Sequence, residues 1–69
     1  MTKQEIVRDL TKVSGCAYCN VSQIAKTRQK SRDWARKLVQ GLPYFYEGNS
    51  KEYRNSDVAE RMMERVREA

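Results

Sequence analysis

Residues 20–40, NVSQIAKTRQKSRDWARKLVQ, decide the fold of this chain. Asn20 and Ser31 are residue types that cap helix N-termini, because their side-chain oxygens accept hydrogen bonds from free N–H groups of the first turn. Each of them precedes a short run of apolar residues with helical spacing. The stretch therefore predicts two short helices joined by a tight turn, one ending near Arg28 and one over residues 31–40.

The second of these helices is predicted to have an apolar side and a basic side. At about 100° per residue, one side carries Trp34, Ala35, Leu38 and Val39. A row at four-residue spacing on another side consists of Arg32, Arg36 and Gln40, flanked by Asp33 and Lys37. We expect the apolar side, Trp34 included, to pack in the core and the basic row to face outward. Such a pair of helices, the second one basic outside, is typical of a helix-turn-helix.

A further helix is predicted near the N-terminus, over about residues 3–13. Thr2 and Glu5 have the spacing of a capping box, in which each side chain bonds to the backbone N–H of the other residue. Gly15 can take the left-handed conformation that ends a helix. The apolar side of this helix would consist of Ile6, Val7, Leu10 and Val13.

A last helix is predicted over residues 56–68, with Ser56 as its N-cap and Asp57 favourable in its first turn. Its apolar side would consist of Val58, Ala59, Met62, Met63 and Val66. Opposite charges at three-residue spacing are Arg61 with Glu64, Glu64 with Arg67, and Arg65 with Glu68. These pairs predict that the outer side of the helix is solvated.

The stretch before this helix, residues 43–54, predicts a β-hairpin. Leu-Pro at residues 42–43 cannot continue a helix, and Tyr-Phe-Tyr at residues 44–46 has strand character. Residues 47–50, EGNS, are typical of a turn, and residues 51–54 can form the returning strand. A two-stranded hairpin is marginally stable alone, so we expect it to pack on the helices as a wing.

Alternation along the two strands predicts that Phe45 and Tyr53 face inward and that Tyr44 and Tyr46 face outward. The chain as a whole is predicted to be mainly α with a small β-hairpin: a winged helix-turn-helix of about four helices and a two-stranded wing. It would form a single domain over residues 1–69, with an N-terminal helix in 1–15, the helix-turn-helix in 20–40, the wing in 43–54 and the C-terminal helix in 56–68.

The net charge of +5 is concentrated in one part of the sequence. Residues 22–40 carry six basic side chains and one acidic one, whereas the rest of the chain is nearly balanced. A localised basic patch on a small domain indicates a polyanion partner. The alternative is a solvated basic surface that has no partner.

The composition gives little support for enzyme chemistry. The chain has no histidine, and its three glycines are too far apart to form a phosphate-binding loop. We therefore predict a protein that is not an enzyme and that takes no cofactor and no small-molecule substrate. The polar composition, the initial Met1 and the absence of a long apolar run predict neither a signal peptide nor a membrane span, and we expect a cytoplasmic location.

Several short pieces between Asn20 and Met62 occur in a recognisable order. They are VSQIA at 21–25, SR at 31–32, LV at 38–39, GLP at 41–43, Tyr53, and SDV at 56–58. In this order the stretch resembles the excisionase and MerR-like winged-helix DNA-binding families; the order and spacing carry the resemblance. It implies sequence-specific binding of double-stranded DNA, either as a recombination directionality factor of a mobile element or as a small transcription regulator.

The resemblance implies that the helix over 31–40 lies in the major groove and that the wing meets the backbone or the minor groove. The expected DNA contacts are Lys26, Arg28, Lys30, Ser31, Arg32, Asp33, Arg36, Lys37, Gln40, Asn49, Ser50, Lys51 and Arg54. Arg32 and Arg36 are candidates for reading base edges. Asp33 would accept a hydrogen bond from a cytosine amine or stabilise the start of its helix. Because one domain buries a modest DNA interface, a second copy on an adjacent site or a recombinase would assist binding.

A different class of function, a protein-interaction module, is the alternative. In that interpretation a partner docks on the first helix or on a face formed by Met62 and Met63, and the basic stretch is incidental.

The Cys16-Ala17-Tyr18-Cys19 segment has the spacing of half a zinc site. A structural zinc ion needs four ligands, and without histidine only two chains together could supply them. The interpretation we favour is that both residues are idle free thiols, with no metal bound.

Overall fold

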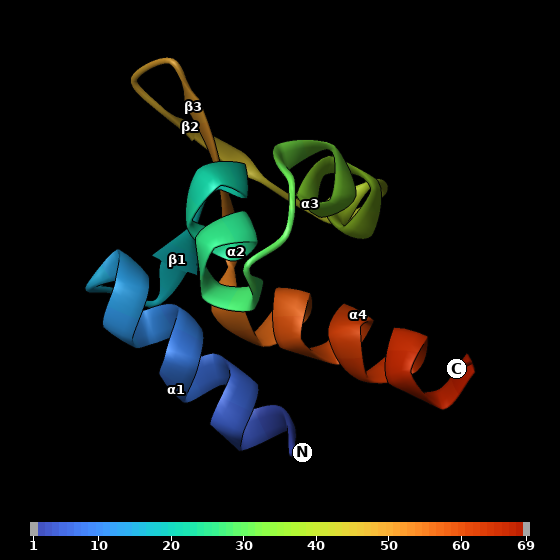
Figure 1. Cartoon of the computed structure of the whole chain (residues 1–69). Helices are drawn as coiled ribbons and strands as arrows, with labels where there is room; N and C mark the ends of the chain where they lie inside the picture. Colours follow the sequence, from blue (N-terminus) through green and yellow to red (C-terminus); the bar gives the residue numbers. More distant parts are fainter. Residues whose placement is uncertain (1, 69) are drawn as a thin grey trace.

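The computed structural model describes residues 2–68, with side chains described through residue 65. Figure 1 shows its elements: α1 (Lys3–Ser14), β1 (Tyr18–Cys19), α2 (Val21–Arg28), α3 (Arg32–Val39), β2 (Phe45–Glu47), β3 (Ser50–Arg54) and α4 (Asn55–Glu68). Within these residues the chain forms four helices and a small antiparallel sheet of three strands. The predicted mainly helical class with a small β element is confirmed, and the predicted strand number of two is wrong.

The first three helices begin where their caps predict. Thr2 and Asn20 each start a complete capping box, and both Asn20 bonds measure 2.9 Å. The Ser31 hydroxyl accepts a hydrogen bond from the backbone N–H of Trp34 at 3.1 Å. Gly15 ends α1 with a φ of 78°, in the left-handed region. Local hydrogen bonding therefore fixes these helix ends.

The turn between α2 and α3 is built without glycine. Gln29 takes the left-handed conformation, with a φ of 55°. The backbone N–H of Lys30 donates to the carbonyl of Ala25 at 2.9 Å, which closes the last turn of α2. The chain then reverses directly into the cap of α3, so the two helices pack on each other.

The third strand, β1, has no counterpart among the predicted elements. It pairs antiparallel with β3, with Tyr18 opposite Arg54 and Cys19 opposite Tyr53, and the sheet order is β1-β3-β2. Two residues are too few to show an alternating pattern. The strand exists because α1 and β3 bring Tyr18 and Cys19 beside the sheet, which is a long-range effect.

The register of the hairpin differs from the predicted alternation. Phe45 pairs with Glu52 and Tyr46 with Lys51, on either side of a turn at residues 48–49. Since paired residues share a face, Phe45 lies on the face opposite Tyr53. Phe45 is 41% exposed, and its ring stands edge-on to that of Tyr18, so its predicted inward placement is wrong.

The other aromatic residues of the hairpin share one face. Tyr53 is buried, as predicted. Tyr44 and Tyr46 are exposed, as predicted, although they lie on the same face as Tyr53 rather than on the opposite one. The Tyr44 ring contacts those of Tyr46 and Tyr53, with centroids 5.8 and 5.9 Å apart. An aromatic surface therefore extends from the core toward the hairpin tip.

Helix α4 begins one residue earlier than predicted, so Ser56 lies in its first turn and is not the N-cap. Asn55, which is 2% exposed, supplies the reason. Its backbone N–H donates to the Ala17 carbonyl, and its Nδ2 donates to Cys16 O at 2.8 Å and to Thr11 Oγ1 at 3.1 Å. These bonds tie the junction of β3 and α4 to the end of α1.

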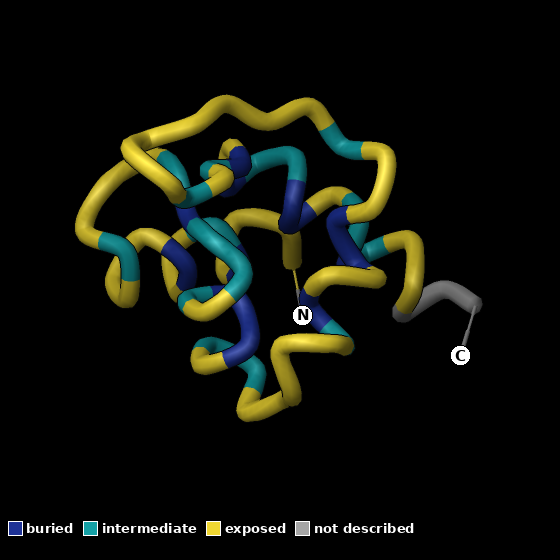
Figure 2. The backbone as a smooth tube through the Cα atoms, turned by 90° about the horizontal axis from the view of Figure 1, so that it is seen from above, coloured by how far each residue is buried: buried dark blue, intermediate teal, exposed yellow. Residues whose placement is uncertain are grey.

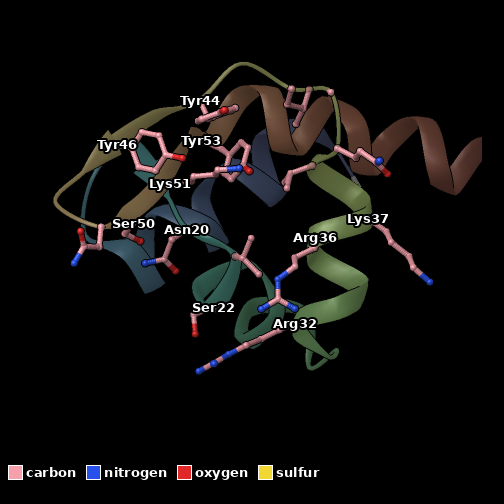
Figure 3. A pocket seen from close by; sticks show the side chains of 16 residues that line it. Asn20, Ser22, Arg32, Arg36, Lys37, Tyr44, Tyr46, Ser50, Lys51 and Tyr53 are labelled. Atoms are coloured by element: carbon pink, nitrogen blue, oxygen red, sulfur yellow. The ribbon is translucent and has the colours of Figure 1, made fainter.

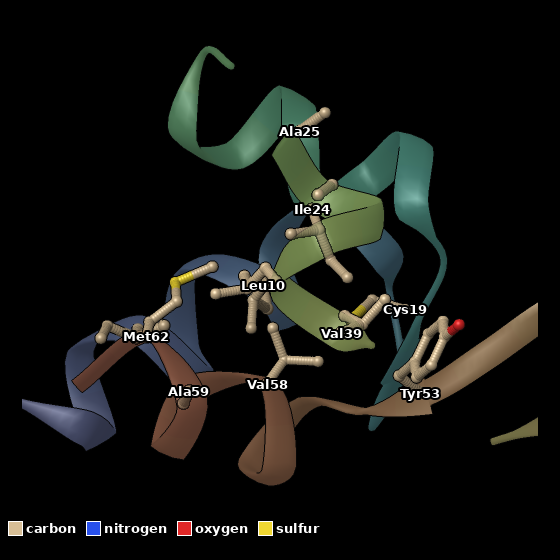
Figure 4. Close-up of a cluster of buried hydrophobic side chains, with 12 residues drawn as sticks. Leu10, Cys19, Ile24, Ala25, Val39, Tyr53, Val58, Ala59 and Met62 are labelled. Atoms are coloured by element: carbon tan, nitrogen blue, oxygen red, sulfur yellow. The ribbon is translucent and has the colours of Figure 1, made fainter. Parts of the chain in front are cut away.

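The core lies between the helices and the inner face of the sheet (Figures 2 and 4). It consists of Ile6, Leu10, Cys19, Ile24, Ala25, Ala35, Leu38, Val39, Tyr53, Val58, Ala59 and Met62. Val7, Val21, Trp34, Leu42 and Met63 pack against it. The predicted inward side of α3 is confirmed, Trp34 included. Val13 in the last turn of α1 is 37% exposed, because this turn extends past the core.

Two expectations for α4 are affected by this packing. Met62 belongs to the core and is 4% exposed, and Met63 is partly buried against it, so the chain itself covers much of the Met62 and Met63 face. Arg61 and Glu64 form the predicted ion pair at 3.7 Å. The predicted pairs with Arg67 and Glu68 and the predicted inward placement of Val66 lie outside the described side chains.

Among the described residues, no helix has the length and apolar character needed to cross a membrane.

Candidate nucleic-acid interface

A groove of about 1160 Å³ lies between α3, the start of α2 and the β2–β3 hairpin (Figure 3). Its polar and aromatic lining includes Arg32, Arg36 and Lys37 of α3 with its C-cap Gln40, Ser22 of α2 with its N-cap Asn20, and Tyr44, Tyr46, Asn49, Ser50 and Lys51 of the hairpin region. Of the 16 lining residues in the described part of the chain, four are basic and none is acidic. The groove is therefore an electropositive surface that attracts anions.

The side of α3 that faces this groove carries the predicted basic row. Arg32, Arg36 and Gln40 are all exposed, because the opposite side of the helix is buried at Ala35 and Leu38. Figure 3 shows Arg32 and Arg36 extending from α3 toward the start of α2, whereas Lys37 points away from them. Two guanidinium groups are thus aimed together over the groove.

Asp33 contacts one of these two arginines. Its Oδ1 accepts a hydrogen bond from Nη1 of Arg36 at 2.8 Å, and both side chains are exposed. Asp33 also lies in the first turn of α3, where a carboxylate is favourable. The contact with Arg36 is an additional role of Asp33, and the three-residue spacing of the two residues on a helix allows it.

The C-terminal end of α3 is held by Arg61 of α4. Nη1 of Arg61 donates to the carbonyl oxygens of Leu38 and Gln40, both at 2.9 Å. A cation at this position donates hydrogen bonds to free carbonyl groups, and it is attracted by the partial negative charge at the C-terminal end of the helix. Arg61 is therefore a positioning residue for α3 as well as a member of the predicted surface pair. The spacing of 23 residues between Arg61 and Leu38 leaves no signal in the sequence.

The hairpin supplies an aromatic wall with one cation. Nζ of Lys51 lies 4.6 Å from the centre of the Tyr44 ring, which is the geometry of a cation–π contact. Asn49 and Ser50 line the groove next to it. Aromatic faces beside cations can stack on bases or pack against sugars, and amide and hydroxyl groups can bond to phosphates.

The groove brings together about half of the residues predicted to contact DNA. Those that line it are Arg32, Arg36, Lys37, Gln40, Asn49, Ser50 and Lys51. Those outside its lining are Lys26, Arg28, Lys30, Ser31, Asp33 and Arg54. Arg54 pairs with Tyr18 and, by alternation along β3, lies on the face opposite Lys51 and Tyr53.

The third wall of the groove, at the start of α2, was not predicted from the sequence. Asn20, Val21 and Ser22 line it, and Ser22 is exposed. A capped helix start with a following serine is visible in the sequence. Its position opposite Arg32 depends on how α2 packs against α3, which no local pattern specifies.

The two cysteines are free and lie in different environments. Cys19 is in the core, and burial raises the pKa of its thiol to about 12, with smaller contributions from Glu52 and Cys16. Cys16 is exposed and donates from Sγ to the Tyr18 carbonyl. Within the described residues, no three His, Cys, Asp or Glu side chains gather where they could hold a metal ion. A zinc site shared by two chains would require Cys19 to leave the core.

At about pH 8, we expect iodoacetamide to modify Cys16 and to leave Cys19 unmodified in the folded protein, because the thiolate is the reactive species. With a pKa of about 12, roughly one Cys19 in 10⁴ is ionised at that pH, and the side chain has no access to solvent. Peptide mass spectrometry would measure both sites, and both should react in urea. Equal rates in the folded protein would contradict the placement of Cys19.

Comparison of this chain with protein-family models, with curated proteins and with solved structures finds no match. The function must therefore be argued from the groove and its charges.

Proposed function

We propose that this protein binds double-stranded DNA in a sequence-specific manner, with α2 and α3 acting as a helix-turn-helix and the β2–β3 hairpin as its wing. The observation that carries the proposal is the groove between α3 and the hairpin, which has four basic lining residues and no acidic one among the residues described. Duplex DNA carries one negative charge per about 1.7 Å of its axis, so such a surface gains affinity by releasing counterions.

The dimensions of α3 suit the major groove. An α-helix with its side chains is about 10–12 Å across, and the major groove of B-DNA is about 12 Å wide, so α3 can enter it. In this arrangement Arg32 and Arg36 face the base edges, and Lys37, which points to the other side of α3, meets a phosphate. The core contacts of α3 and its tie to Arg61 hold the helix rigidly, which lowers the entropy lost on binding.

The hairpin would meet the DNA backbone or the minor groove beside α3. Asn49, Ser50 and Lys51 supply the polar contacts there. Arg54 is left out of this interface, because it lies on the other face of the sheet. Lys26, Arg28, Lys30 and Ser31 lie near the end of α2 and in the turn before α3, where we assign them to flanking phosphates.

Two biological settings suit a domain of this kind. One is an excisionase-like role as a recombination directionality factor of a mobile element, and the other is transcription regulation. In both, a small interface would favour a second copy on an adjacent site or an accessory recombinase as a further partner.

The salt dependence of DNA binding tests the proposal. Fluorescence anisotropy with a labelled duplex of about 20 base pairs should show about a 10³-fold loss of affinity between about 50 and 200 mM salt, as about six phosphate contacts predict. The protein-interaction alternative predicts no duplex binding. If the folded protein fails to bind any duplex at the lower salt concentration, the proposal is wrong.

A further inference from the structure

The two arginines of the groove, Arg32 and Arg36, differ in their contacts, because only Arg36 bonds to Asp33 among the described side chains. Nη1 of Arg36 donates a hydrogen bond to Oδ1 of Asp33 at 2.8 Å. Within the described side chains, this contact is the ion pair that Arg36 forms. Arg32, one turn earlier, has no ion pair of this kind among the same residues. One guanidinium is therefore bonded to its own helix, and the other has no ion pair among the described side chains.

This ion pair contributes little to stability, because both partners face water. The side chain of Arg36 is 62% exposed and that of Asp33 is 82% exposed. Exposed pairs of this kind are weakened by solvent and by the entropy of fixing two side chains. The consequence of the contact is thus the direction in which it holds the guanidinium, since a free arginine side chain populates many rotamers.

The bond through Nη1 leaves a specific edge of Arg36 available. The guanidinium is a planar fork of five N–H donors, and with Nη1 engaged the parallel Nε–H and Nη2–H donors remain. Arg36 lines the groove and extends over it (Figure 3), whereas Asp33 is outside the lining. A ligand in the groove that reaches this edge of Arg36 would meet a pair of parallel donors.

Among the four bases, guanine matches this pair of donors. In the major groove guanine presents two acceptors, O6 and N7, on one edge. Adenine presents an acceptor beside a donor, thymine an acceptor beside a methyl group, and cytosine a donor. We propose that Asp33 positions Arg36 to select guanine, so that the target duplex has a guanine at the base pair beneath Arg36. This inference rests on the proposed DNA-binding function.

The positioning role differs from a purely structural one in its expected effects. Asp33→Ala removes a negative charge near the phosphates, so binding to random duplex should be unchanged or tighter. It also frees Arg36, so the preference for guanine should fall. If Asp33 acted only by stabilising the start of α3, the substitution would weaken binding to all duplexes alike.

The experiment begins with selection of a preferred duplex from a randomised pool by the wild-type protein. Anisotropy then compares that duplex with three others: one with guanine replaced by adenine, one with 7-deazaguanine, which lacks the N7 acceptor, and one of random sequence. We expect the wild type to prefer guanine by about 10-fold over each replacement at one position. We expect Asp33→Ala to reduce this preference to about 3-fold or less, with random-duplex affinity retained.

Asp57→Ala is the matched control, since Asp57 occupies the first turn of α4 and lies outside the groove lining. It should leave the guanine preference unchanged, and circular dichroism would verify that both variants are folded. Relaxation of the Arg36 Nε–H in the free wild type and in Asp33→Ala would report the loss of order directly. A guanine preference that survives Asp33→Ala, or an equal loss for every duplex, would overturn the positioning role alone. Failure of the wild type to bind any duplex would overturn the proposed function as well.

Discussion

Replacing both Arg32 and Arg36 with alanine is expected to weaken binding of the preferred duplex by at least about 100-fold. A hydrogen bond from a charged group contributes about 1.5–3 kcal/mol, and two such contacts exceed the roughly 2.8 kcal/mol that corresponds to this factor. Because both side chains face base edges, the slope of log affinity against log salt should fall by less than the roughly two units that the loss of two phosphate contacts would give. Anisotropy titrations at several salt concentrations would measure both effects.

A control with the same loss of charge is available on the far side of the molecule. Arg8 and Lys12 are exposed on α1, which lies away from α3 and the hairpin in Figure 1. Arg8→Ala with Lys12→Ala also removes two positive charges, and we expect an affinity loss of less than about 5-fold, since distant charges are screened. Similar losses for the two double variants would contradict a localised interface and indicate attraction by net charge alone.

The helical part of the fold is predictable from the sequence because its signals are local. The caps at Thr2, Asn20 and Ser31 act within three residues of themselves, and the apolar spacing of α3 fixes which side is buried. The exposed arginine row follows from the same spacing, because residues four positions apart lie on the same side of a helix. The sequence alone therefore assigns Arg32 and Arg36 to one side of α3.

The features that the sequence does not predict depend on contacts between distant segments. β1 forms by pairing across 34 to 36 residues. The error at Phe45 has a local cause instead, because the turn at residues 48–49 pairs Phe45 with Glu52 and so places it on the face opposite Tyr53. Asn55 contacts residues 39 and 44 positions earlier. The third wall of the groove depends on the packing of α2 against α3. None of these relations leaves a periodic pattern that a single sequence can show.

Asn55→Asp is expected to destabilise the protein by about 3–5 kcal/mol at pH 7, the cost of a buried charge without a partner. The substitution replaces the Nδ2 donor by an oxygen that would face the carbonyl of Cys16, and the existing Oδ1 of Asn55 is already buried with no hydrogen-bond partner among the described residues. A domain of this length has a total stability of roughly 3–10 kcal/mol. Urea unfolding followed by circular dichroism would measure the loss.

The pH dependence distinguishes a buried charge from a merely missing hydrogen bond. Burial without a cation raises the pKa of the new carboxyl group in the folded state above its unfolded value of about 3.9. The protonated form of the carboxyl group then favours folding. The loss in free energy of unfolding relative to the wild type should therefore be smallest below about pH 4, and it should grow as the pH rises toward the folded-state pKa. Asn55→Ala removes the same donor without adding a charge, and its deficit of about 1–3 kcal/mol should be independent of pH.

Asn49→Asp provides the same chemical change at an exposed position of the hairpin, where we expect less than about 0.5 kcal/mol of effect on stability. Wild-type stability of Asn55→Asp at pH 7 would show that position 55 is open to water in solution, which would contradict the anchoring of α4 to α1.

Asn55 lies outside the groove lining, so the folded fraction of the variant should bind duplex DNA with wild-type affinity. A loss of affinity beyond the unfolded fraction would mean that this anchor also sets the position of the hairpin against α3, because β3 runs directly into Asn55.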